Sequence, residues 1–157
     1  MEISNVNDLN NLQDDALFDE VLRRTEEKVD SFNDFIEGVK ALPHAAQVFY
    51  VTTLYEAEVN NGGLCQFFVN SSRFFAPVLA DYLDEIGAEE HKALFEAFIR
   101  DNGIDVDDLS SFVIDDLDEF EEQTERYPFD DFDDAFYAME PIEKLILPYL
   151  RAHIEEF

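Results

Sequence analysis

Apolar residues recur along this chain at spacings of three and four residues, and no sustained run alternates between apolar and polar residues. A helix turns every 3.6 residues, whereas a strand exposes alternate side chains to opposite faces, so the pattern favours helices over strands. With 157 residues, of which 46% are hydrophobic, the chain can bury one core. We therefore expect an all-α fold: a single compact domain of about six to eight helices with no significant sheet.

Glycine, proline and asparagine residues divide the apolar pattern into separate helices. The expected helices run from Phe18 to a break at residues 38–43, from Val48 to a break at 60–63, from Phe75 to Gly87, from Leu94 to Asn102, on either side of Tyr127 and Pro128, and from Pro141 with a kink at Pro148. Residues 1–13 are Asn-rich and lack the pattern. They are expected to form a flexible extension to a single acidic all-helical domain, residues 14–157.

The charge balance limits which partners the chain can bind. It contains 38 acidic and 10 basic residues, which gives a formal net charge of −28. DNA, RNA and anionic membranes repel such a chain, so no direct nucleic-acid partner and no membrane partner is expected. Basic proteins are the favoured partners, although solubility or a salty environment would also explain the acidity. No signal peptide or membrane span is visible, which predicts a cytoplasmic protein.

Half of the net charge lies between Asp101 and Asp134, where 34 residues contain 15 carboxylates and a single base, Arg126. A fully helical segment of this length would span about 51 Å at about 1.5 Å per residue. It would carry one carboxylate per roughly 3.4 Å, close to the spacing of charges along one DNA strand. Neighbouring carboxylates repel one another, so their accumulation is easier to understand if a basic partner relieves them.

This acidic segment also has an apolar side. Phe129, Phe132 and Phe136 are spaced as on one face of a helix, with Asp residues on the other faces. The segment is therefore expected to fold as two short amphipathic helices that turn carboxylates outward. The predicted partner-binding residues are Asp115, Asp116, Asp118, Glu119, Glu121, Glu122, Glu125, Asp130, Asp131, Asp133 and Asp134.

No pattern typical of catalysis occurs in the sequence. His44, His91 and His153 lack ligand-type spacing, and there is no Gly-rich phosphate loop or Cys-x-x-Cys pair. Loops that begin at Asp101 or Asp105 lack the glycine that a calcium-binding loop of the EF-hand type needs at its sixth position. We predict that the protein is not an enzyme, with no catalytic residue, no metal site and no cofactor.

The sequence also predicts the surroundings of two single residues, Cys65 and His91. Cys65 lies among apolar neighbours and is expected to be a small buried residue without a nucleophilic role. His91 stands beside two glutamates at the start of an expected helix, which predicts a partly exposed, salt-bridged side chain.

The most distinctive short motif spans Glu58 to Asn70. Its polar residues lie among aromatic residues, so Glu58, Asn60, Gln66 and Asn70 are candidates for a buried hydrogen-bond network around a helix break. The residues assigned to this motif are Glu58, Asn60, Asn61, Gly62, Gly63, Gln66 and Asn70. A ligand site built on these polar groups is the alternative interpretation.

The motif also carries a resemblance to a known family. The run from Tyr55 to Gly63, followed by Gln66, Phe67, Phe68 and Asn70, resembles a bacterial DNA-mimic protein family, with the pattern Glu-Val-x-Asn-Gly-Gly-x-x-Gln-x-Phe. The similarity is good over about residues 45 to 100. It implies a small acidic helical domain that forms a homodimer and presents carboxylates where DNA presents phosphates, thereby occupying the DNA-binding surface of a transcription regulator.

Three functional hypotheses follow. The first is an acidic DNA-mimic-type protein that docks on the basic DNA-binding surface of a transcription regulator or other nucleic-acid-binding protein and blocks it. The second is an immunity or antitoxin protein that neutralises a basic toxin or nuclease. The third is a small-ligand binder or enzyme with a pocket near Glu58, Asn60 and Gln66. We favour the first, which relies on a segment separate in sequence from the motif that indicates the fold.

Overall fold

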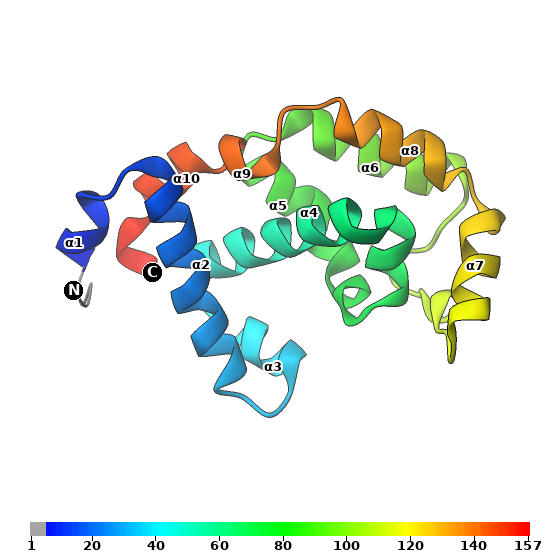
Figure 1. The fold of residues 1–157 in the computed structure, drawn as a ribbon, viewed down its shortest axis with the longest axis horizontal. Coiled ribbons are helices and arrows are strands. Elements are labelled where there is room, and N and C mark those ends of the chain that lie inside the picture. Colours follow the sequence, from blue (N-terminus) through cyan, green and yellow to red (C-terminus); the bar gives the residue numbers. More distant parts are fainter. Residues whose placement is uncertain (1–5) are drawn as a thin grey trace.

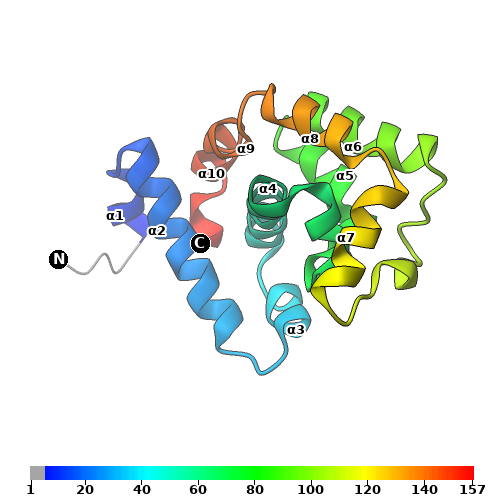
Figure 2. The same cartoon turned by 45° about the vertical axis from the view of Figure 1, so that its right-hand side comes forward.

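The longest helix of the chain, α4 (His44–Val69), forms the centre of the fold (Figure 1). Val48, Phe49, Val51 and Thr52 are all buried and lie on one broad face of the helix, whereas Ala57, Asn60 and Asn61 on the other side are exposed. A helix with such a broad buried face packs against several neighbours. In this computed structural model, which describes residues 6–157, α2, α5, α8 and α9 surround α4, as the end-on view of α4 in Figure 2 shows.

The other elements are shorter. They are α1 (Val6–Asn10), α2 (Asp14–Asp30), α3 (Phe35–Lys40), α5 (Ala76–Glu85), α6 (Glu89–Asp101), α7 (Leu117–Arg126), α8 (Phe129–Tyr137), α9 (Ile142–Leu145), α10 (Leu147–Ala152), and the 3₁₀ turns η1 (Ser71–Phe75), η2 (Ser110–Phe112) and η3 (Ile154–Glu156). Residues 6–157 contain no strand, which confirms the predicted all-α class. Six of the helices in this range have nine residues or more. No helix within it is long and apolar enough to cross a membrane.

Most predicted breaks coincide with helix ends. The first apolar pattern divides into α2 and α3, where the Asp34 carboxylate accepts a hydrogen bond from the Glu37 N–H and caps α3. Pro148 lies in the first turn of α10, so it begins a new helix after α9. Proline is tolerated there because the first N–H groups of a helix have no partner within the helix.

The N-terminal segment is partly helical. Residues 1–5 of the expected extension lie outside the described residues, but α1 follows them and the Leu9 side chain is fully buried. Arg151 of α10 donates a hydrogen bond to the Leu12 carbonyl oxygen at 2.9 Å and binds the Asp14 carboxylate at 2.7 Å. The described part of the segment therefore packs against the domain.

Candidate functional site

The acidic helices α7 and α8 meet at an angle at one end of the molecule (Figures 1 and 2). Between them Tyr127 is extended, with φ −136° and ψ 161°, and Pro128 precedes α8. The carboxylates therefore do not follow the single straight line considered for a fully helical segment. We call residues 115–137 the acidic corner.

Most predicted partner-binding residues are exposed in the acidic corner. The exposed residues are Asp115, Asp116, Asp118, Glu121, Glu122, Glu125, Asp130, Asp131 and Asp134. Glu119 is partly buried because its carboxylate accepts a hydrogen bond from the Asp115 N–H at 2.6 Å, while the Asp116 carboxylate accepts one from the Glu119 N–H at 2.9 Å. These two hydrogen bonds fix the start of α7, where Asp116 is the N-cap residue.

Within the described residues, no carboxylate of the acidic corner forms a salt bridge. In the part of the chain that the structure describes, the salt bridges use acidic residues of α2, α5 and α6 and none from the corner. Arg126 instead donates hydrogen bonds to the Ser111 carbonyl oxygen at 3.0 Å and to Gln123 at 2.8 Å. Its guanidinium lies over the rings of Phe112 and Tyr127. The negative charge of the corner is therefore uncompensated.

A cluster of aromatic rings supports the acidic corner from inside. Phe129, Phe132 and Phe136 are buried on one face of α8, as their spacing predicts. The Phe98 ring of α6 stacks on Phe129 at 5.3 Å and meets Phe132 edge-on at 5.4 Å between ring centroids. Since such contacts have preferred geometries, they fix the orientation of α8 and of the Asp residues on its outer faces.

Asp133 differs from the other aspartates of α8 because it points inward. Its carboxylate accepts a hydrogen bond from the Leu64 N–H of α4 at 2.9 Å. Burial raises the pKa of Asp133 above its ordinary value, and the hydrogen bond from Leu64 partly opposes this. The prediction that all four aspartates of α8 face a partner is therefore corrected for Asp133, which stabilises the fold.

The hydrogen bond from Leu64 is available because α4 is interrupted. Gly62 and Gly63 have non-helical backbone angles, which confirms the predicted break, and the helix resumes at Leu64. Gly63 has φ +77°, and a Cβ atom there would lie 2.2 Å from an Asp133 carboxylate oxygen. Only glycine is compatible with both the backbone angle and the close approach of Asp133.

The helix α8 binds α4 on both sides of this break. Asp133 accepts from the N–H of Leu64 after the break, and the Tyr137 hydroxyl donates to the Val59 carbonyl oxygen before it, at 2.7 Å. The two side chains are four residues apart and so lie on the same face of α8. The motif and the acidic segment, which are separate in sequence, are thus joined in the structure.

The polar residues of the motif form a hydrogen-bond network close to the surface. One carboxylate oxygen of Glu58 accepts from Gln66 at 2.7 Å and from Asn70 at 2.9 Å, and Gln66 accepts from Asn61 at 3.0 Å. Asn60 is exposed and lies outside this network, in which Asn61 takes part instead. Glu58 and Gln66 are only half-buried, so the network is shallower than predicted, and it spans the break in α4.

Glu56 has a structural role that the sequence pattern did not predict. Its carboxylate is buried and accepts hydrogen bonds from the N–H groups of Ile142 and Glu143, so it caps the start of α9. Burial raises the pKa of Glu56 above its ordinary value, an effect that these backbone hydrogen bonds partly oppose. The motif thus anchors α9 through Glu56 and α8 through the break at Gly63.

The prediction for Cys65 is confirmed, whereas the prediction for His91 is wrong. Cys65 is buried as predicted, and burial raises the pKa of its thiol to about 12. His91 was expected to be partly exposed and salt-bridged, but it is 1% exposed and its Nε2–H donates to the Glu140 carbonyl oxygen at 2.7 Å. Its ring contacts Phe136 because this side of the first turn of α6 faces the core.

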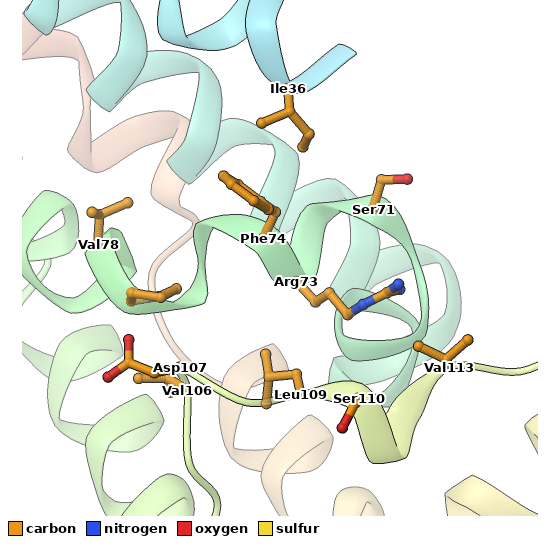
Figure 3. A pocket seen from close by; sticks show the side chains of 11 residues that line it. Ile36, Ser71, Arg73, Phe74, Val78, Val106, Asp107, Leu109, Ser110 and Val113 are labelled. Carbon is orange, nitrogen blue, oxygen red and sulfur yellow. The ribbon is translucent and has the colours of Figure 1, made fainter. Parts of the chain in front are cut away.

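A wide groove borders the loop that leads into the acidic corner (Figure 3). It has a volume of about 650 Å³ and is lined mainly by apolar side chains of η1, α5 and the loop before α7, including the exposed Phe74 and Val113. Arg73 borders it, but the Arg73 guanidinium donates hydrogen bonds to the carbonyl oxygens of Val69 and Asn70 at the end of α4.

A family model described as DMP19-like protein matches residues 40–153, a range that includes all of α4 and the whole acidic corner. No curated protein and no solved structure matches the chain.

Proposed function

The chain belongs to the DMP19-like family, and from this premise we propose that it is a DNA mimic. In this proposal the exposed carboxylates of the acidic corner occupy the basic DNA-binding surface of a transcription regulator or another nucleic-acid-binding protein and block access of DNA to it. The partner is recognised by its Lys and Arg residues, which would otherwise contact phosphates.

The observation that carries the proposal is the unpaired charge of the corner. Nine exposed carboxylates have no salt bridge to a base within the described residues. Pairs four residues apart on α7, such as Asp118 with Glu122, are about 5–6 Å apart between Cβ atoms and repel each other. A basic partner would relieve this repulsion.

The second argument is that the fold holds these carboxylates in fixed positions. The aromatic cluster and the contacts of Asp133 and Tyr137 with α4 hold α8 in place. A partner that binds an ordered surface does not lose free energy in ordering a flexible chain, as it would with an acidic tail. An ordered array of charges also discriminates between basic surfaces by shape, which a tail cannot do.

The test is to capture partners on the immobilised protein and to challenge them with DNA. A partner held as proposed is released by rising salt and by duplex DNA, because both compete for the same basic surface. The corner variant carries Asp130→Asn, Asp131→Asn and Asp134→Asn and keeps Asp133, because Asp133 is needed by the fold. This variant should lose most of the partner.

A matched control removes three exposed carboxylates elsewhere. The substitutions Asp19→Asn, Glu26→Gln and Asp30→Asn change the net charge by the same amount on α2, and this variant should retain the partner. Equal loss in both variants would show that only net charge matters. Failure of duplex DNA to displace any captured protein would reject mimicry, and capture of a toxin or nuclease alone would favour the neutralising role.

A further inference from the structure

A second groove opens at the start of α7, inside the acidic corner. It has a volume of about 380 Å³, and its apolar lining consists of Val69, Ile114, Leu117 and Phe120. The amides of Gln66 and Asn70 border it at the end of α4, where both are bound to Glu58. We call it the α7 groove.

Leu117 is the most conspicuous residue of the α7 groove. Its side chain is 82% exposed, more than any other large hydrophobic residue that the structure describes as exposed. A single exposed leucine is ordinary. Here, however, Leu117 adjoins the partly buried Phe120, Ile114 and Val69, and together they form a continuous apolar surface with no segment of the described chain covering it.

The charges around the groove determine what can cover it. Asp115 and Asp116 line it, and Asp118 directly follows Leu117. None of these carboxylates forms a salt bridge within the described residues. An acidic or phosphate-bearing ligand is repelled, and a second copy of this chain brings its own net charge of −28. The complementary occupant is an apolar side chain flanked by positive charge.

We propose that the α7 groove receives an apolar side chain from a basic segment of the partner protein, with Lys or Arg residues on either side of it that reach Asp115, Asp116 and Asp118. This inference rests on the proposed function and adds the chemistry of the partner. The groove anchors the segment, and the carboxylates align it.

The two kinds of contact respond differently to salt. Attraction between charges is screened as the ionic strength rises, whereas burial of an apolar side chain is not weakened in this way. The apolar contact in the α7 groove therefore adds affinity at every salt concentration, while the electrostatic part of the binding still weakens as the salt concentration rises. The groove also restricts the partners to basic proteins that expose an apolar residue within the basic segment.

Two synthetic peptides test the inference with the full-length protein. Both have the same length and the same number of Lys and Arg residues, and they differ only in a central residue, Leu in one and Ser in the other. Affinities are measured by isothermal titration calorimetry at low and at raised salt. We expect the Leu peptide to bind about tenfold more tightly than the Ser peptide at both salt concentrations.

The substitution Leu117→Ser should abolish this tenfold difference without altering how the binding of either peptide depends on salt. The matched control is Phe32→Ser, which replaces another exposed apolar residue between α2 and α3 and should keep the difference. Equal affinity of both peptides for the unmodified protein would overturn the groove inference and leave the acidic surface intact. Absence of binding by either peptide at low salt would overturn the proposed function as well.

Discussion

Carboxylates on α2 and carboxylates in the acidic corner differ in whether they form salt bridges. On α2, Asp14 pairs with Arg151, and Glu20 pairs with both Arg23 and Arg24. The hydrogen bond from Arg23 is the main cause that lowers the pKa of Glu20 to about 2. In the acidic corner no carboxylate has such a partner within the described residues. The salt bridges therefore lie on other helices, and the exposed carboxylates of the corner remain unpaired, as the proposed binding to a basic partner requires.

The corner itself contains a second contrast. Asp130, Asp131 and Asp134 are exposed, whereas Asp133 is half-buried and bound to the backbone of α4. On this one short helix, three aspartates contribute negative charge to the surface, whereas Asp133 stabilises the fold. Substitutions can distinguish these roles, because only those that affect the inward contacts should change stability strongly.

The largest effect is expected for Gly63→Ala. The new methyl group would require a left-handed backbone angle and would collide with Asp133, so the contact between α8 and α4 would be lost. We expect the free energy of unfolding to fall by about 3 kcal/mol, measured by chemical denaturation. The control is Gly62→Ala, since φ is −146° there and the nearest atoms belong to the side chain of Gln66, which can move at the cost of its hydrogen bonds near the surface. Equal losses in both variants would contradict the special role of Gly63.

Asp133→Ala should have the next largest effect. It leaves the Leu64 N–H at the start of a helical segment without its acceptor, which should cost about 1–2 kcal/mol of unfolding free energy. Asp134→Ala serves as the control because it removes an exposed carboxylate of the same helix, and it should leave stability unchanged or slightly higher. A loss of stability in the Asp134 variant as large as that in the Asp133 variant would remove the distinction between inward and outward carboxylates.

Mild acidification should raise the melting temperature. Burial raises the pKa values of Glu56 and Asp133 above the ordinary 4.5 and 3.8. An acid with a higher pKa in the folded protein than in the unfolded chain binds its proton more tightly when folded, so stability increases as the pH falls through the folded pKa. Scanning calorimetry from neutral pH to about pH 5 should show this rise. A variant with Glu56→Gln and Asp133→Asn should show a smaller one.

Glu20 has the opposite dependence. Because its folded pKa is lowered to about 2, its contribution to stability is complete above its ordinary value of 4.5 and is lost as the pH falls through the folded pKa. Glu20→Gln should therefore leave the rise above pH 4.5 unchanged. A melting temperature that falls steadily from neutral pH downward in the unmodified protein would show that the buried carboxylates do not control this range.

The periodic pattern of apolar residues was sufficient to predict the longer helices and the buried face of α8, but not the short helix α1. The same periodicity also marks polar residues that are buried. Glu56, His91 and Asp133 each occupy a position within an apolar stripe, as Asp133 does between Phe132 and Phe136, and all three are turned inward. A polar residue in an apolar stripe therefore predicts a buried hydrogen bond.

The partners of these residues could not be predicted in the same way. Glu56 binds the backbone of Ile142 and Glu143, and Asp133 binds that of Leu64, across 86, 87 and 69 residues of sequence. Backbone N–H groups are identical along the chain, so nothing in the sequence marks which of them will lie next to a given carboxylate. Only the packing of α8 and α9 against α4 determines this.

The smallest effects test the difference between the salt-bridged carboxylates of α2 and the unpaired carboxylates of the acidic corner. Removing a paired carboxylate by Glu20→Gln should lower the free energy of unfolding by about 0.5 kcal/mol, since salt bridges near the protein surface contribute little even where, as for Glu20 and Arg24, the side chains are partly buried. Removing an unpaired one by Glu122→Gln should raise it by about 0.3 kcal/mol, because Glu122 repels Asp118 one turn earlier on α7. The opposite signs matter more than the sizes, and denaturant midpoints measured side by side at low salt can resolve them. If Glu122→Gln also destabilised the protein, the carboxylates of the corner would contribute to folding, and their availability to a partner would lose its main physical argument.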